Sequence, residues 1–437
     1  MLRKKIYIGW YVMLISIKNF IFILFFIAAF LILPFLLDLN FNIVGMTFYM
    51  NVLFCVIYIG LSLKKNISSI LFYYIFNLLF MSFIPWINYS NNVVFWSNNI
   101  FSNSDYIFAN IILFFFNFLI FLFYNLFPIS ISKELKILKE PNFFIAILIC
   151  SLSLFVVLYA FDFNLNRVFF RGREDDLTEN TSVNPFFSIF VMLSRLLPAF
   201  ILMRYLVAKK YFKASIILIF VLLCAFPTGI ARFLVAFIYL PLLLTVIPFL
   251  RKSINITLLI IFSIIIIFPF LNQFRYFSSD SEIKLLPEAV FFNQAHFDAY
   301  QNFVEVLRVD FVTHGYQLLG VLFFFVPRFL WNDKPFGSGY QLSLDQGYAF
   351  NNISMPFIAE GYVNFGYLGF IIFSIFLAFC MKKIDSLYLI KANSINFNYC
   401  KGVFLCAAIF FMLRGDLMSS FSFLLAGIVA FKIAEKI

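Results

Sequence analysis

The stretch FFFVPRFLWNDKPFGSGYQ, residues 323–341, decides how many times this chain crosses a membrane. It continues an apolar run that begins at residue 318 and stops at Pro327-Arg328, where the sequence turns polar and rich in glycine. A helix needs about 20 apolar residues to cross a hydrocarbon core of roughly 30 Å. The run is shorter than that, so the residues around it must show whether it crosses.

The composition predicts an integral membrane protein. Of 437 residues, 63% are hydrophobic and only 12% are charged, and the mean hydropathy of +0.98 lies far outside the soluble range. A formal charge of +11 would suggest a nucleic-acid partner in a soluble protein. In a membrane protein, basic residues must first be sorted by side of the bilayer, and we expect no nucleic acid as a partner.

Twelve apolar runs have about the length of a membrane span, the last two being short: 19–37, 43–63, 67–87, 107–128, 143–161, 186–206, 212–228, 232–250, 254–271, 362–381, 402–414 and 417–433. Lysine-rich loops alternate with loops that are poor in lysine, and only Lys284 and Lys334 fall in the latter, which places both termini in the cytoplasm under the positive-inside rule. The start MLRKK and the following run resemble an uncleaved signal anchor. We therefore predict an all-α polytopic membrane protein with about 12 transmembrane helices.

The positions of the lysine-rich loops show whether the run at 318–326 crosses the membrane. If the run at 318–326 crossed, the Lys382-Lys383 pair would be moved outside. We therefore predict a short or re-entrant helix near 316–331 that dips into the membrane or lies along its outer surface. The predicted organisation has three parts: residues 1–271 with nine spans and an external loop at 162–185, a large external loop at 272–361, and residues 362–437 with three spans.

Arginine is distributed differently from lysine. Several arginines fall in external loops, and others fall within spans or at their outer ends, where topology alone would not put them. Planar, bidentate recognition of phosphate explains such a surplus, and an ionisable residue inside a span is a functional hypothesis by default. Pairing with external acids is the open alternative for any single arginine. The candidates are Arg171, Arg195, Arg232 and Arg414.

Two of these arginines have a distinctive local sequence. Arg232 follows PTGIA, and the proline and glycine would let a helix end open towards a cavity with free N–H groups that can meet an anion. Arg414 ends an apolar run as LRGD. An ordinary boundary ion pair between Arg414 and Asp416 is an equally good interpretation of that motif.

The polar half of the opening stretch carries candidate sugar- and phosphate-binding residues. Arg328 and Lys334 are cations, Trp331 and Tyr340 offer flat faces to sugar rings, and Gly339 permits close backbone approach. An interfacial loop of aromatic residues is the alternative interpretation.

Glu360 and His314 are the candidate general bases. A carboxylate held close to hydrophobic surface has a pKa raised towards neutrality, although Glu360 can also be a boundary charge that reaches the membrane surface. Both histidines of the chain lie in the large external loop, where one can act as a base or simply face solvent.

The sequence predicts no metal and no cofactor. The six cysteines form no CxxC spacing, and neither histidine belongs to an HxxEH pattern. The acids at 174–176 are flanked by Arg171 and Arg173, which would already neutralise them. No Walker loop, GxGxxG or GxSxG motif is present. A donor must therefore bring its own bond energy, and a sugar linked to a lipid diphosphate does so.

Several segments resemble the Wzy-type O-antigen and oligosaccharide repeat-unit polymerases of bacterial inner membranes. They are TGIAR, the large late external loop, PRFLWNDKP and AEGYVNFGYLG, together with the number and orientation of the spans. Such polymerases carry an Arg-x10-Gly pattern in a large periplasmic loop, and Arg328 with Gly339 has this spacing. No matching motif is evident in the earlier loop, and neither histidine fits the His-x10-Gly pattern of the related O-antigen ligases.

The resemblance implies a GT-C-like, metal-independent glycosyltransferase without a cofactor, whose active site faces the periplasm. It would transfer a growing glycan from undecaprenyl diphosphate to a lipid-linked single repeat unit, with membrane lipids and a chain-length regulator as further partners. Arginines, foremost Arg232, Arg328, Arg195 and Arg171, would bind the diphosphate. A flippase or exporter of lipid-linked oligosaccharide, or an O-antigen ligase, is the alternative, although the long loop at 272–361 disfavours a transporter.

Overall fold

Helices make up nearly all regular structure in the described part of the chain. The computed structural model describes residues 17–63, 66–97, 100–128, 140–170, 185–273, 289–389 and 396–437. Within these ranges the structure is all-helical, with 77% helix and no strand. The predicted all-α class is therefore confirmed.

Nine helical segments in the described ranges are long and apolar enough to cross a membrane. They are Ile43–Ser62 (α2), Ser69–Ser90 (α3, η1 and α4), Asn103–Leu126 (α5), Phe143–Ala160 (α6), Phe187–Val207 (in α8, Pro185–Val207), Ser253–Phe270 (α11, η4 and part of α12), Tyr367–Leu389 (α17 and η7), Phe397–Arg414 (α18) and Leu417–Lys436 (α19). Shorter apolar helices are α9 (Tyr211–Cys224), α10 (Arg232–Val246) and the Phe26–Leu36 part of α1 (Ile17–Leu36). Every predicted run overlaps one of these helices, while the count of twelve spans and the orientation of the termini stay predictions.

Polar residues mark where several of the apolar helices begin. Inside a membrane the backbone groups of a span are satisfied only by the helix itself, so the first N–H groups need partners at its end. Ser102 and Asp105 form a reciprocal capping box at the start of α5. Asn142, Asn396 and Asp416 cap α6, α18 and α19 through their side chains. The ends of these spans are therefore encoded locally.

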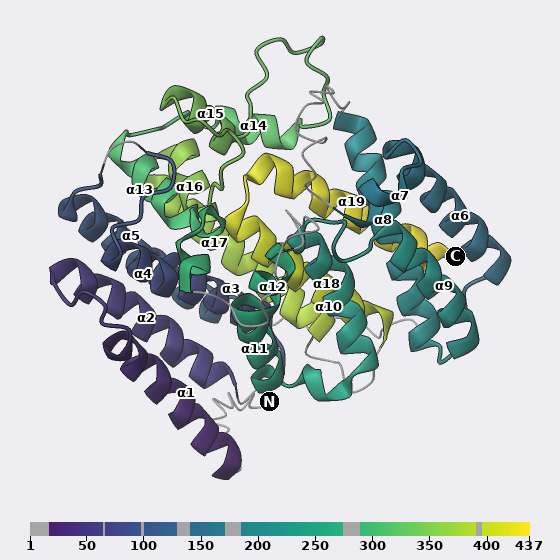
Figure 1. The fold of residues 1–437 in the computed structure, drawn as a ribbon, viewed down its shortest axis with the longest axis horizontal. Helices are drawn as coiled ribbons and strands as arrows, with labels where there is room; N and C mark the ends of the chain where they lie inside the picture. The colour runs from purple at the N-terminus through teal and green to yellow at the C-terminus, as the bar shows by residue number, and fades with distance from the viewer. Residues whose placement is uncertain are drawn as a thin grey trace, which may run out of the picture.

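Helix α18 lies between two apolar cores (Figure 1). One core includes α2 to α5, α13 (Ala299–Arg308), α16 (Phe357–Phe365) and α17, and it receives Val403 and Cys406 of α18. The other includes α6, α8, α9, α10 and α19, and it receives Phe404 and Ala407. Because α18 is buried against both halves, its end at Arg414 lies where they meet.

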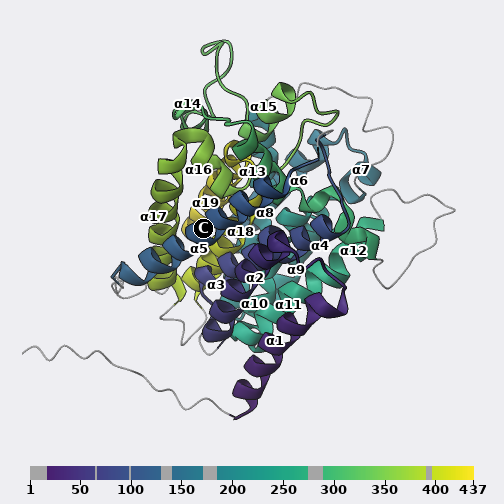
Figure 2. The same ribbon diagram turned by 90° about the vertical axis from the view of Figure 1, so that its left-hand side faces the viewer.

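The large loop folds into short helices at one end of the molecule. These are α13, α14 (Tyr316–Leu322), α15 (Ser338–Asp345) and α16, which gather over α17 and α19 in both views (Figures 1 and 2). The helix predicted near 316–331 is shorter than expected, because α14 ends at Leu322 and residues 323–337 form turns. Helix α14 rests on α19 and α16.

Two glycines bring α16 against α17. A Cβ atom on Gly369 would lie 1.7 Å from the carbonyl oxygen of Gly361, so the two backbones touch. Gly366 between the helices has φ +56°, a left-handed conformation that glycine adopts without strain. This tight corner fixes the position of α16 and, with it, of Glu360.

Candidate functional site

The turn Arg414-Gly415-Asp416 between α18 and α19 is held by two parts of the large loop. On one side, Arg414 Nε donates to the carbonyl oxygen of His296 at 3.1 Å. On the other side, the backbone N–H of Gly339 donates to Asp416 Oδ2 at 3.0 Å. The end of α18 therefore meets the residues before α13 and the start of α15 within three positions of the chain.

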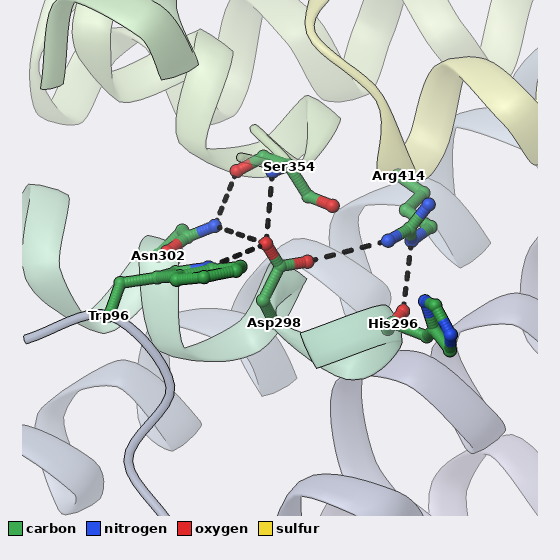
Figure 3. Close-up of polar contacts among 6 residues, drawn as sticks. All are labelled: Trp96, His296, Asp298, Asn302, Ser354 and Arg414. Atoms are coloured by element: carbon green, nitrogen blue, oxygen red, sulfur yellow. Dashed lines mark hydrogen bonds and ion pairs between the residues drawn. The ribbon is translucent and has the colours of Figure 1, made fainter. Parts of the chain in front are cut away.

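Asp298 is the centre of the polar cluster on the Arg414 side (Figure 3). Its Oδ2 atom accepts hydrogen bonds from Trp96 Nε1 at 2.9 Å, Asn302 Nδ2 at 3.2 Å and the Ser354 backbone N–H at 3.1 Å. Its Oδ1 atom lies 3.5 Å from Nη2 of Arg414. Asp298 is 1% exposed, so this buried carboxylate ties four separate segments together.

Arg414 pairs with Asp298, not with its sequence neighbour. The boundary pair between Arg414 and Asp416, which the LRGD motif allowed, is not the pair that the structure describes. Asp416 instead caps α19, where its Oδ1 atom accepts from the N–H of Met418 at 2.9 Å. About a third of the Arg414 side chain is exposed. The guanidinium at the end of α18 is therefore both oriented and partly exposed.

Glu360, which is buried, and Asp416, which is half-buried, bring two carboxylates together beside this cluster. Glu360 Oε2 accepts from the Ser338 hydroxyl and Oε1 accepts from the Leu417 backbone N–H, both at 2.8 Å. Burial raises the pKa of Glu360 above its usual range, and the charge of Asp416 raises it further. Burial also raises the pKa of Asp416. Glu360 is thus a deeply buried carboxyl group, and not a boundary charge reaching the membrane surface.

Residues 337–339 lie very close to Asp416 and Ile353, because two of the three are glycines. A Cβ atom on Gly337 would lie 2.4 Å from Asp416 Oδ2, and one on Gly339 would lie 2.7 Å from the carbonyl oxygen of Ile353. Gly339 was predicted to permit close backbone approach to a substrate. In the structure its close neighbours are the protein's own Ile353 and Asp416.

The raised pKa of Glu360 predicts a pH dependence of stability. An acid with a raised folded-state pKa stabilises the fold fully below its unfolded pKa of about 4.3, and this contribution is lost as pH rises through the folded value. The Glu360→Gln variant cannot ionise. We expect its melting temperature, measured in detergent by loss of the monodisperse chromatographic peak, to fall less between pH 5 and pH 8 than that of the wild type. Parallel curves would contradict this expectation.

Arg232 lies at the same end of the bundle as Arg414. Helix α10 begins at Arg232 and runs antiparallel to α18, against which it packs through Phe237 and Phe411, with ring centroids 5.8 Å apart. The Arg232 guanidinium lies over the Phe268 ring at 5.9 Å. Arg232 and Arg414 therefore lie at neighbouring ends of two packed helices, and a shared role in binding an anion stays a prediction.

The structure says less about the two other predicted arginines, Arg195 and Arg171. Arg195 is buried within α8, and its guanidinium lies over the ring of Phe161 at 5.0 Å. Helix α8 contacts α18. Arg171 lies outside the described residues, as do the acids at 174–176. The roles of both arginines stay predictions.

Arg328 and Lys334 donate to the turns of their own loop. Arg328 Nη1 donates to the carbonyl oxygen of Lys334 at 2.6 Å, and its guanidinium lies 3.9 Å from the centroid of Phe336. Lys334 Nζ donates to the carbonyl oxygens of Phe324 at 2.6 Å and Val326 at 3.0 Å. These bonds satisfy carbonyl groups that a helix would otherwise satisfy, so the two cations hold the loop shape. A role in substrate binding stays a prediction for both.

The remaining predicted residues lie on the outer surface. Trp331 meets Tyr316 edge to face at 6.2 Å, and Tyr340 is exposed beside the ring of Phe336 at 4.9 Å. His314 is exposed and has φ 51° just before the turn into α14. His314 therefore lies on the surface, whereas Glu360 is buried.

Sequence reasoning missed Asp298, Asn302, Ser354 and Trp96 as members of the cluster. Each is an ordinary polar or aromatic residue in its own segment, and only their convergence on one carboxylate distinguishes them. Among the described residues, no three His, Cys, Asp or Glu side chains are grouped so as to hold a metal ion.

The fold and this site define a multi-pass helical membrane protein with a charged cluster at one end of the bundle. The family model of O-antigen polysaccharide polymerase Wzy matches residues 343–434. This range includes Glu360, Arg414 and Asp416 but neither Asp298 nor Arg328. The predicted resemblance is confirmed over that part of the chain, and it indicates a glycosyltransferase-type polymerase. No curated protein and no solved structure matches the chain.

Proposed function

We propose that this protein polymerises lipid-linked oligosaccharide repeat units at the periplasmic face of a bacterial inner membrane. It would transfer the growing glycan from its undecaprenyl diphosphate carrier to the non-reducing sugar of a lipid-linked single repeat unit. One observation carries this proposal above the others. Arg414, within the range that matches the polymerase family, is oriented by the buried Asp298 and lies two residues before Asp416, which adjoins the buried Glu360.

On the donor side, Arg414 binds the diphosphate. Its planar guanidinium suits bidentate contact with phosphate oxygens, and the neighbouring helix end contributes Arg232. Arg195 and Arg171 are further candidates for the same anion. Negative charge grows on the diphosphate as its bond to the sugar breaks, and preorganised cations stabilise that charge. The bond energy of the donor drives the transfer, so this GT-C-like mechanism requires no metal or nucleotide from the protein.

On the acceptor side, Glu360 is the proposed base. Its raised pKa suits proton uptake near neutral pH. Because Ser338 donates to Glu360 at 2.8 Å, the serine hydroxyl can relay the proton. The acceptor hydroxyl passes its proton to Ser338 as Ser338 passes its own to Glu360. The acceptor oxygen then bonds to the anomeric carbon, and the diphosphate leaves with the electron pair. His314 is the second candidate base.

The surface around α15 is the proposed sugar-binding region. Tyr340 and Trp331 offer exposed or half-buried aromatic faces, while Arg328 and Lys334 keep the intervening loop in shape. Gly339 connects this region directly to Asp416. We infer that the glycan passes over these residues, with the lipid tails of both substrates in the surrounding bilayer. A chain-length regulator would contact the same outer face.

The proposed function is tested in a strain that lacks the gene. We expect its undecaprenyl diphosphate to carry only single repeat units, on the periplasmic leaflet, because addition of further units stops while export continues. Introduction of the wild-type gene should restore a ladder of chain lengths on gels. Units that accumulate on the cytoplasmic leaflet would support a flippase instead, and full-length polymer retained on the lipid would support a ligase.

A further inference from the structure

We propose that Asp298 is a positioning residue, which orients the guanidinium of Arg414 so that it can receive an anion of the pyrophosphate class. The inference rests on the proposed function, in which Arg414 binds the donor diphosphate. It adds a residue outside the range that matches the polymerase family.

The two carboxylate oxygen atoms of Asp298 contact different groups. Oδ2 accepts from three donors, on Trp96, Asn302 and Ser354, at 2.9 to 3.2 Å. Rotation of the carboxylate would break these bonds in a buried site, where unsatisfied polar groups are costly. The direction of Oδ1 is therefore fixed, and Oδ1 is the atom that faces Arg414.

The donors themselves are held in place. Gln301 accepts from the Phe95 backbone N–H at 3.0 Å and donates to the carbonyl oxygen of Val93 at 2.7 Å, which fastens the segment before Trp96 onto α13. Trp96 also stacks on Phe350, with ring centroids 5.1 Å apart. A supporting shell of this kind keeps a binding group in its productive geometry.

The guanidinium is held along one edge. Nε donates to the carbonyl oxygen of His296 and Nη2 faces Asp298, two residues further along the same turn (Figure 3). The Nη1 end therefore points away from both residues. Since about a third of the Arg414 side chain is exposed, the orientation presents the cation to an incoming anion without burying it.

The distance between Arg414 and Asp298 is long enough for a phosphate group to form shorter bonds to the same guanidinium. At 3.5 Å the pair is longer than a charge-assisted hydrogen bond of about 2.7 to 2.9 Å. The Asp298 carboxylate thus sets the direction of the Arg414 guanidinium and offsets its charge at the end of an apolar helix. Phosphate oxygens can form shorter bonds to the same guanidinium, so Asp298 guides Arg414 without competing strongly for its donors.

The test is a double-mutant cycle with inorganic pyrophosphate as the probe. Binding to the purified, full-length protein in detergent is measured calorimetrically for wild type, Asp298→Asn, Arg414→Gln and the double variant. Asparagine retains an acceptor oxygen for the three donors but presents an amide to Arg414. We expect each single variant to weaken binding about tenfold, as loss of one charge-assisted contact does, and the double variant to bind no more weakly than Arg414→Gln.

Two further variants keep the test decisive. Glu435→Gln removes a charge from an exposed position at the end of α19, and we expect unchanged binding. If Asp298→Asn does not fold, Trp96→Phe removes only one donor to Oδ2 and should weaken binding about threefold, by a fraction of the same contact energy. That weakening should vanish in the Arg414→Gln background.

The outcomes separate this inference from the proposed function. If Arg414→Gln loses binding while Asp298→Asn and Trp96→Phe bind like the wild type, the positioning role is overturned and the diphosphate role of Arg414 stands. If Asp298→Asn weakens binding equally in the Arg414→Gln background, Asp298 acts independently of Arg414, which also overturns it. If Arg414→Gln binds pyrophosphate normally, the diphosphate role of Arg414 itself fails.

Discussion

Replacement of Arg414 by glutamine is expected to reduce the rate of polymerisation at least about 100-fold, because loss of one preorganised donor to a developing anion costs roughly 3 kcal/mol. Glutamine keeps a polar side chain at the end of α18 but removes the charge that would offset the leaving diphosphate. The measurement is the rate at which purified protein in nanodiscs converts lipid-linked single repeat units into a ladder. Membrane insertion should be unchanged.

The control for Arg414 is a partly exposed arginine away from this cluster, Arg167. Arg167 pairs with the mostly exposed Asp162 at 3.3 Å, so Arg167→Gln removes the same charge without changing the cluster around Asp298. We expect it to polymerise at close to the wild-type rate. Arg414→Lys should retain only part of the activity, since an ammonium cannot form the planar bidentate contact. A normal ladder from Arg414→Gln would remove this residue from the mechanism.

Two substitutions of Glu360 are expected to have different effects. Glu360→Gln keeps the volume of the side chain and an oxygen that can accept from Leu417, so stability at pH 6 should change little. It cannot take up a proton, and loss of a general base lowers the rate by about 100-fold or more. Glu360→Ala leaves the Ser338 hydroxyl and the Leu417 N–H without their acceptor and creates a cavity, which should cost about 2 to 4 kcal/mol of stability.

Both variants are measured for polymerisation rate and for melting temperature in detergent. Glu435→Gln, on an exposed side chain at the end of α19, is the matched control and should leave both quantities unchanged. If Glu360→Gln polymerises normally while Glu360→Ala is unstable, Glu360 only joins α15 and α16 to α19. The search for the base would then turn to His314, with His314→Asn as the next variant.

Much of the fold was predictable because a membrane span is a local property. Apolar runs of sufficient length predicted helices that the structure contains, and capping residues such as Asn142 and Asp416 mark their starts. The helix expected near 316–331 was predicted too long. The aromatic run before Pro327 was compatible with a helix, but Lys334 satisfies the carbonyl groups of Phe324 and Val326 in turns instead.

The candidate site was predictable only in part. Arg414, Arg232 and Glu360 stood out because charged residues in or beside apolar runs are unusual. Arg328 and Lys334 stood out for the same reason, yet their hydrogen bonds in the structure go to their own loop. A charge pattern shows where the cations lie in the sequence but not which acceptors they bind, because the positions of the acceptors depend on the folded backbone.

The sequence by itself determined the class of protein, its apolar helices, and the arginines and carboxylates worth testing, because length, apolarity and charge are properties of short segments. Only the tertiary structure decided that Arg414 pairs with Asp298, that Glu360 is buried against Leu417, and that Trp96 supports the cluster. Trp96 and Asp298 lie 202 positions apart in the chain. Contacts between such distant residues arise from packing of the large loop onto α18 and α19, which no local pattern specifies.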